Sequence, residues 1–175
     1  MPLHIALLES LTPAVVGAVA RACGDVDASL HLVGPLPFAR DDVTLRKAGP
    51  RDWSKLDWWV HPGWRDFRDA MARERCLYFA HDAERDASEA PYKANSVLVI
   101  GTESGTLPDR IRDKYPTRIY RLPAAPRKGK GELAQSVELL LKLAKEREGK
   151  QVGGGVVVER TEPMRFGRGP SRTRR

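Results

Sequence analysis

Cysteine is scarce in this chain: its 175 residues include only Cys23 and Cys76, and both stand among apolar neighbours. Two such cysteines do not make the disulfide framework of small secreted domains, so we expect buried thiols in a reducing compartment. The sequence also lacks any apolar run of about 18 residues, which a membrane-spanning helix would need. Residues 1–5 show neither a basic segment nor a long apolar core, so no secretory signal is expected. These absences predict a cytoplasmic protein without a membrane span, and they leave an organellar location open.

The residue patterns of several common enzyme classes are absent as well. His4, His31 and His81 are scattered along the chain, with no cysteine or carboxylate at the spacing of a metal site, so no metal is predicted. No Ser-His-Asp arrangement and no Walker-type phosphate loop occurs. His61 ends an apolar run, and we interpret it as a packed residue at a strand end rather than as a catalyst.

Basic charge, by contrast, is in excess. The formal net charge is +7, and residues 151–175 hold six arginines against two glutamates. A basic balance favours an anionic partner, most often a nucleic acid, although such a tail can also serve solubility alone. We expect one domain over residues 1–150, followed by a basic, flexible C-terminal tail over residues 151–175.

Apolar runs alternate with amphipathic segments along most of the chain. The runs expected as strands are residues 3–8, 30–33, 58–61, 76–80, 97–100 and 118–122. The segments expected as helices are residues 13–23, 41–48, 64–73, 109–114 and 131–147. Thr12 and either Asp41 or Asp42 are candidate N-caps for the first two of these helices. This alternation predicts an α/β fold with a mostly parallel sheet flanked by helices.

The stretch from Ser96 to Pro108 is where a ligand is most expected. A buried strand ends at Gly101, a loop of small residues follows, and a helix begins after Pro108. Backbone N–H groups point outward at such a junction, and glycine lets a ligand approach closely. Taken alone, the pattern fits a plain strand-to-helix connection somewhat better than a ligand site.

At this point the residues carry a resemblance to a known family. Residues 34–49 read GPLPFARDDVTLRKAG, which is close to a pattern that the SpoU branch of the SPOUT superfamily has after its second strand. His61, Trp64 and Phe67 also match, and three signature regions follow in the family's order at residues 13–21, 101–108 and 122–137. Over residues 3–147 the chain thus resembles RNA ribose 2′-O-methyltransferases, and most of all the small tRNA wobble-nucleotide enzymes.

The resemblance implies a fold and a site that alternation alone does not predict. It implies a C-terminal trefoil knot, whose loops hold S-adenosylmethionine largely through backbone groups, and a homodimer that completes each site. On this chain the cofactor positions would be Ala80, Gly101, Glu103, Leu122 and Lys130. The RNA substrate would be tRNA first, with rRNA as the alternative. The dimer would use the first helix and the long C-terminal helix.

The signature regions depart from the family's pattern where the chemistry is expected. Gly17 and Arg21 are kept, but Val15 and Ala18 stand in place of two asparagines. Gly105 replaces an arginine, and residues 129–134 lack the expected serine and asparagine. Two hypotheses therefore remain: an RNA 2′-O-methyltransferase, or a catalytically silent RNA-binding protein that acts as a structural or assembly factor.

Arg21 is the candidate catalytic residue under the first hypothesis. Free arginine titrates above pH 12, so clamping the target phosphate suits Arg21 better than acting as a base. Arg127, Lys128 and Lys130 make the third signature region basic, and they are the candidate RNA-binding residues. The plain alternative for Arg21 is an arginine on the surface of the first helix.

Overall fold

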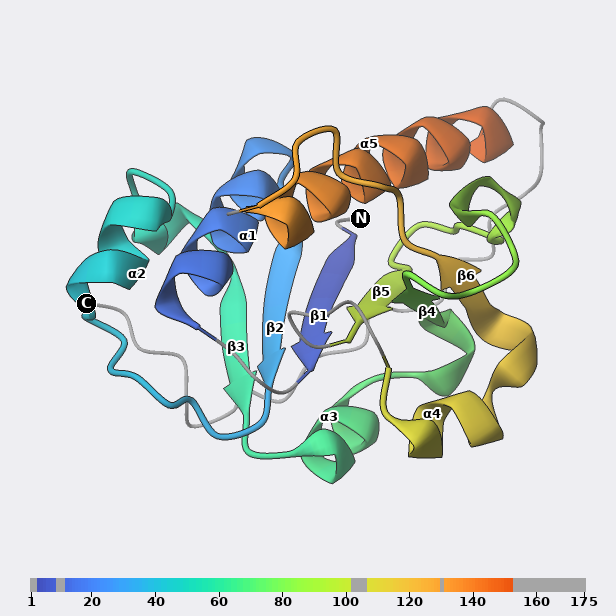
Figure 1. Cartoon of the computed structure of the whole chain (residues 1–175), viewed down its shortest axis with the longest axis horizontal. Helices are drawn as coiled ribbons and strands as arrows, with labels where there is room; N and C mark the ends of the chain where they lie inside the picture. The colour runs from blue at the N-terminus through green and yellow to red at the C-terminus, as the bar shows by residue number, and fades with distance from the viewer. Residues whose placement is uncertain (1–2, 9–11, 102–106, 130, 153–175) are drawn as a thin grey trace.

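The computed structural model describes residues 3–8, 12–101, 107–129 and 131–152 (Figure 1). Its six strands are β1 (His4–Leu8), β2 (Ser29–Val33), β3 (Trp58–His61), β4 (Cys76–Ala80), β5 (Val97–Ile100) and β6 (Ile119–Arg121). Its helices are α1 (Pro13–Asp25), α2 (Val43–Ala48), α3 (Trp64–Ala70), α4 (Asp109–Lys114) and α5 (Glu132–Val152). Four 3₁₀ turns join them, η1 (Trp53–Lys55), η2 (Arg73–Arg75), η3 (Ala87–Glu89) and η4 (Pro116–Arg118).

The strands form one sheet in the order β3-β2-β1-β5-β4-β6, and every neighbouring pair is parallel. Parallel strands need crossover connections, and the helices between them supply these. The predicted α/β class with a parallel sheet is confirmed.

Helices cover both faces of this sheet, as is usual for parallel strands (Figure 1). On one face α1 and α5 pack side by side over Ile5, Leu32 and Leu98, which belong to the larger core cluster. On the other face α3 and α4 place Phe67 and Ile111 against the smaller cluster. The strand positions alternate between the two clusters, as the period of two along a strand requires.

Local signals set several boundaries. The Asp42 carboxylate accepts a hydrogen bond from the Leu45 backbone N–H at 3.0 Å and caps α2, which ends before Gly49. Pro13 opens α1, but the Thr12 side chain makes no capping hydrogen bond.

The predicted helix over residues 64–73 is wrong at its end, because α3 stops at Ala70. Met71 has an extended backbone (φ −117°, ψ 138°) and is buried against the sheet with Phe67. Burial of Met71 in the core therefore takes precedence over the helical periodicity of the segment.

Candidate active site

Three of the predicted cofactor positions lie together at the carboxyl ends of β4, β5 and β6. The Leu122 backbone N–H donates to the Ala80 carbonyl at 3.0 Å. Phe79 of β4 pairs with Ile100 of β5, so the residues that follow them, Ala80 and Gly101, lie beside each other. All three residues are buried. Segments that are about 20 residues apart or more along the chain thus converge at one edge of the sheet.

This edge has the chemistry of a site built from backbone groups. Ala80, Gly101 and Leu122 bring no charged side chain, and Leu107 adds a further buried apolar side chain to the same part of the molecule. Backbone N–H and C=O groups next to apolar side chains suit a ligand with a flat ring and polar edges. The residues present therefore fit a cofactor of that kind.

Two predicted positions cannot be placed. Glu103, in segment 102–106, and Lys130 lie outside the described residues, as does the tail from residue 153 onward. The path of the chain that would form the predicted knot depends in part on segment 102–106, so the knot stays a prediction.

Arg21 lies on the face of α1 that meets α2. A Cβ atom on Gly17 would stand 2.7 Å from the Ala48 Cβ and 2.8 Å from the Leu45 carbonyl oxygen, so the two helices touch there. A Cβ atom on Gly24 would stand 3.7 Å from the Pro50 Cβ, which is an ordinary contact distance. Positions 17, 21 and 24 share one helix face, so the exposed Arg21 emerges beside the segment that follows α2.

The predicted RNA-binding loop is held against the start of α5. The Arg127 N–H donates to the Gln135 side-chain oxygen at 3.1 Å, and the Gln135 amide donates back to the Arg127 carbonyl at 3.3 Å. The Gly129 N–H donates to the Glu132 carboxylate at 3.0 Å, where Gly129 has a φ of +106°. Backbone groups make these bonds, so the side chains of Arg127 and Lys128 stay exposed.

The histidines that look scattered in the sequence form a hydrogen-bonded chain across three strands. His4 Nδ1 lies 3.0 Å from His31 Nε2, and His31 Nδ1 lies 3.0 Å from His61 Nε2. The parallel register sets each histidine two positions further along its strand than its neighbour. His61 is the last residue of β3, and its ring centre lies 5.3 Å from that of Phe67. It is thus a packed residue at a strand end.

Burial disfavours the charged form of all three imidazoles. Desolvation lowers the pKa of His4 to about 4, with the Arg75 charge adding to this and Asp57 opposing it. Desolvation lowers the pKa of His31 well below its usual value, and the neighbouring His4 and His61 lower it further. Burial also lowers the pKa of His61, against the pull of Asp66. In the sequence, the only sign of this arrangement is that each of three predicted strands contains a histidine. Whether the three side chains meet depends on the register between the strands.

Both cysteines are free and buried, as expected. Burial raises the pKa of the Cys76 thiol to about 11 and raises that of Cys23 even more, so neither is a reactive thiolate near neutral pH. Within the described ranges no group of three or more His, Cys, Asp or Glu residues could hold a metal ion. No helix in the described part of the chain is long and apolar enough to cross a membrane.

Known proteins resemble this chain over most of its length. A tRNA (cytidine(34)-2′-O)-methyltransferase of Methylovorus glucosotrophus is 30% identical over 138 residues, which cover 78% of this chain and 90% of that protein. A putative tRNA (cytidine(34)-2′-O)-methyltransferase of Bacillus subtilis is 27% identical over 124 residues, 69% of this chain and 78% of the relative.

Solved structures share the fold. One, described as giving insight into 2′-OH methylation of C/U34 on tRNA, has a TM-score of 0.71 and 26% identity and covers 83% of this chain and 89% of its own. A putative RNA methyltransferase of Bacillus anthracis has a TM-score of 0.68 and 23% identity over 90% of this chain and 99% of its own. The model of the SpoU rRNA methylase family matches residues 2–141, and the chain therefore belongs to that family.

Proposed function

We propose that this chain methylates a ribose 2′-hydroxyl of tRNA with S-adenosylmethionine, the donor that membership of the family implies. The observation that carries the proposal is the similarity to the Methylovorus relative, which extends over 90% of that protein. The coarser assignment, an RNA 2′-O-methyltransferase, follows from the family itself. We place the reaction in the cytoplasm, where tRNA is abundant.

In this proposal the edge formed by β4, β5 and β6 holds the cofactor. The backbone around the hydrogen bond from Leu122 to Ala80, together with that of Gly101, would hold the adenosyl part, and the buried side chains would exclude water from it. When bound, the cofactor supplies an electrophilic methyl group on a sulfonium. We assign Glu103 to anchoring the loop after Gly101, and Lys130 to the cofactor and the adjacent RNA phosphate.

Arg21 orients the RNA rather than taking its proton. Its guanidinium keeps its charge and donates from a fixed fork that matches a phosphate. Binding the phosphate beside the target ribose holds the 2′-hydroxyl in line for attack, and orientation of this kind can supply about 7 kcal/mol or more. Arg127 and Lys128 add phosphate contacts from the loop before α5.

We further propose a homodimer in which α1 and α5 face the partner subunit. These helices lie side by side on one face of the sheet (Figure 1). α5 also carries Leu139, one of two large apolar side chains that are exposed in the described part of the chain. A dimer on this face would bring the partner's RNA-binding residues near the site.

The test measures transfer of labelled methyl from S-adenosylmethionine to total tRNA, with cofactor binding followed separately by calorimetry. Arg21→Ala should lower methyl transfer about 100-fold or more, because orientation of the hydroxyl is lost, while cofactor binding stays unchanged. Arg65→Ala is the matched control, because Arg65 is an exposed arginine on α3, across the sheet. Equal activity of Arg21→Ala and the parent would contradict the role of Arg21. A parent protein that binds RNA but transfers no methyl would instead support the catalytically silent alternative.

A further inference from the structure

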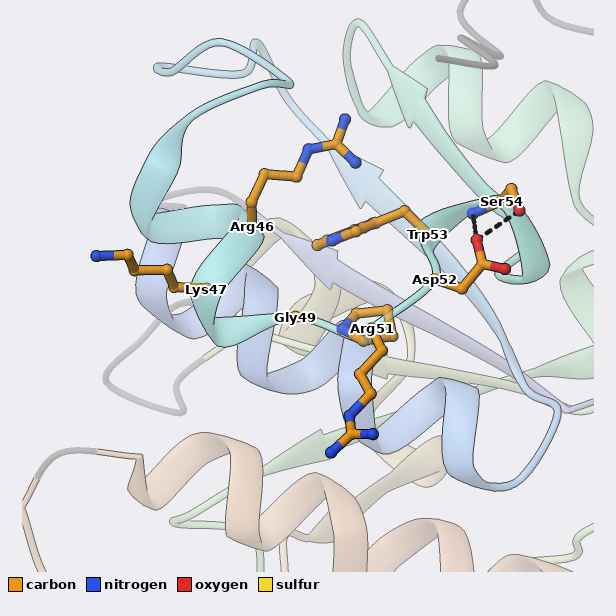
Figure 2. A pocket seen from close by; sticks show the side chains of 8 residues that line it. Arg46, Lys47, Gly49, Arg51, Asp52, Trp53 and Ser54 are labelled. Carbon is orange, nitrogen blue, oxygen red and sulfur yellow. Dashed lines mark hydrogen bonds between the residues drawn. The ribbon is translucent and has the colours of Figure 1, made fainter.

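A basic hollow lies between the end of α2 and η1, on the side of the molecule away from β4 and β6 (Figure 2). Its volume is about 430 Å³, and it opens to solvent. The residues that line it are Arg46, Lys47, Gly49, Pro50, Arg51, Asp52, Trp53 and Ser54. The motif at residues 34–49 overlaps this segment, but the family resemblance gave the segment no role.

The charge of the hollow suits an anion. Three of its side chains are cationic and one, Asp52, is acidic. The Asp52 carboxylate is already engaged, because it accepts hydrogen bonds from the backbone N–H and the hydroxyl of Ser54. Arg46 and Arg51 lie on opposite sides of the hollow, and Lys47 points away from Trp53 (Figure 2). Cations that are spread out in this way match successive phosphates of a chain better than one compact anion.

Trp53 lines the hollow and is packed into the larger core cluster. Trp53 is 8% exposed, and its ring centre lies 5.3 Å from that of Trp58. The Arg46 guanidinium stands over the Trp53 ring at 5.4 Å, which limits its freedom before any ligand binds. A Cβ atom on Gly49 would overlap the Trp53 indole, so the close contact of this backbone with the ring depends on glycine.

The hollow adjoins the position of Arg21. Gly17 and Gly24, which flank Arg21 on its face of α1, approach Gly49 and Pro50, and both of these line the hollow. The backbone N of Gly49 would lie 3.1 Å from a Cβ on Gly17. A polymer held by Arg21 can therefore continue into the hollow without crossing the sheet.

We propose that this hollow binds the phosphodiester backbone of the RNA substrate next to the nucleotide at Arg21. The inference rests on the proposed function, because it takes Arg21 as the contact to the target phosphate. Phosphate contacts fix the register and orientation of a nucleic acid without reading its sequence. Arg46 and Arg51 are thus positioning residues, and the hollow sets which nucleotide reaches the site.

The experiment compares Arg46→Gln, Arg51→Gln and the double variant with the parent, and Arg65→Gln serves as the control cation. The probe is a labelled RNA hairpin with the sequence of a tRNA anticodon arm, titrated at several salt concentrations. The double variant should bind about tenfold or more weakly at low salt, and its log–log salt slope should fall by about one per lost phosphate contact. Cofactor binding by calorimetry should not change, and the KM for tRNA should rise more than kcat falls.

Arg51→Gln keeps the experiment interpretable if Arg46→Gln disturbs Trp53, because Arg51 is exposed and does not cover the ring. Parent-like RNA binding by the double variant would overturn the proposal even if the parent methylates tRNA. An equal loss in Arg65→Gln would also overturn it, because the effect would then be one of overall charge. A parent without methyl transfer, whose RNA binding still depends on Arg46 and Arg51, would refute the proposed function and leave this site standing.

Discussion

The three linked imidazoles of His4, His31 and His61 constrain one another. Each contact joins Nδ1 of one ring to Nε2 of the next, so three neutral rings must share the same tautomer. One added proton can be accepted with both hydrogen bonds kept. Two added protons cannot. If His4 and His61 carry them, His31 would have to accept at both of its nitrogens, and if His31 carries one, two N–H groups face each other across one contact. Acid should therefore break the hydrogen bonds between the three histidines.

From the three linked histidines we expect the free energy of unfolding to fall as the pH falls below about 6.5. The folded pKa of His4 is about 4, below its value of 6.5 in the unfolded chain, so the unfolded state binds more protons between these values. The stability that neutral His4 contributes is complete above pH 6.5 and is lost as the pH falls toward 4. At pH 4.5 the free energy of unfolding should be lower by on the order of 1–3 kcal/mol. Urea unfolding from pH 7.5 to pH 4.5 measures it.

Two variants separate the histidine chain from other groups that titrate. His31→Phe should lower the free energy of unfolding at pH 7.5 by about 1–3 kcal/mol, because it removes the hydrogen bonds of His31 to His4 and to His61, and should make the dependence on pH shallower. His81→Gln, at an exposed histidine, should leave the slope unchanged. Hydrogen bonds lower the pKa of Asp52 and Asp86, so the stability that these carboxylates contribute is lost as the pH falls through about 3.8, mostly below the range measured. If the free energy of unfolding of the parent did not change between pH 7.5 and pH 4.5, the histidines would have no part in its pH dependence.

At the scale of elements, the contact of α1 with α2 determines how Arg21 is presented. Gly17 permits the contact, because any larger residue would meet the Leu45 carbonyl and the Ala48 side chain. Backbone atoms cannot move aside as a flexible side chain can. The sequence showed Gly17 only as a retained signature residue, whereas the structure gives it a packing role.

The two glycines of α1 should respond to alanine in opposite ways. Gly17→Ala should destabilise the protein by about 1–3 kcal/mol, because α1 and α2 must separate to admit a methyl group. Gly24→Ala places its methyl group at an ordinary contact distance from Pro50 and should stabilise the helix by up to about 1 kcal/mol. Thermal and urea unfolding of the two variants make a matched comparison. Equal changes in stability for the two variants would show that the close contact of α1 with α2 is not what requires glycine at position 17.

At the scale of the whole molecule, the sheet separates two regions. The predicted cofactor edge lies at β4, β5 and β6, whereas Arg21 and the basic hollow lie on α1 and α2, beyond β1. A single chain thus presents the two parts of the proposed reaction at separate places. The proposed homodimer through α1 and α5 is the arrangement that would let one protomer's Arg21 serve its partner's cofactor edge.

Sedimentation at micromolar concentration should therefore show a dimer. Leu139→Glu should shift the equilibrium toward the monomer, because it puts a charge on the exposed side of α5. Val43→Glu is the control, because Val43 is 66% exposed on α2 and lies outside the proposed interface. A parent that sediments only as a monomer would rule out a site shared between protomers. Equal dissociation of the two variants would place the interface elsewhere.

The sequence by itself determined the elements and their order. Runs such as 97–100 are apolar enough to be buried on both faces, and signals such as Asp42 and Gly49 act over only a few residues. Local patterns of this kind can be read without the fold, which is why the strands lie where they were expected. Helix ends were read less well. α3 stops three residues before the expected end, because burial of Met71 is a tertiary effect, and α5 continues to Val152, beyond the expected end at residue 147.

Tertiary structure alone decided which distant residues meet. Strand order and register brought His4 to His31 and His31 to His61, and they closed the hydrogen bond from Leu122 to Ala80. The contact of α1 with α2 likewise put Arg21 beside the hollow. A sequence pattern fixes which face of its own element a residue occupies. The pairing of elements depends on burying many apolar side chains at once, and no single segment encodes that.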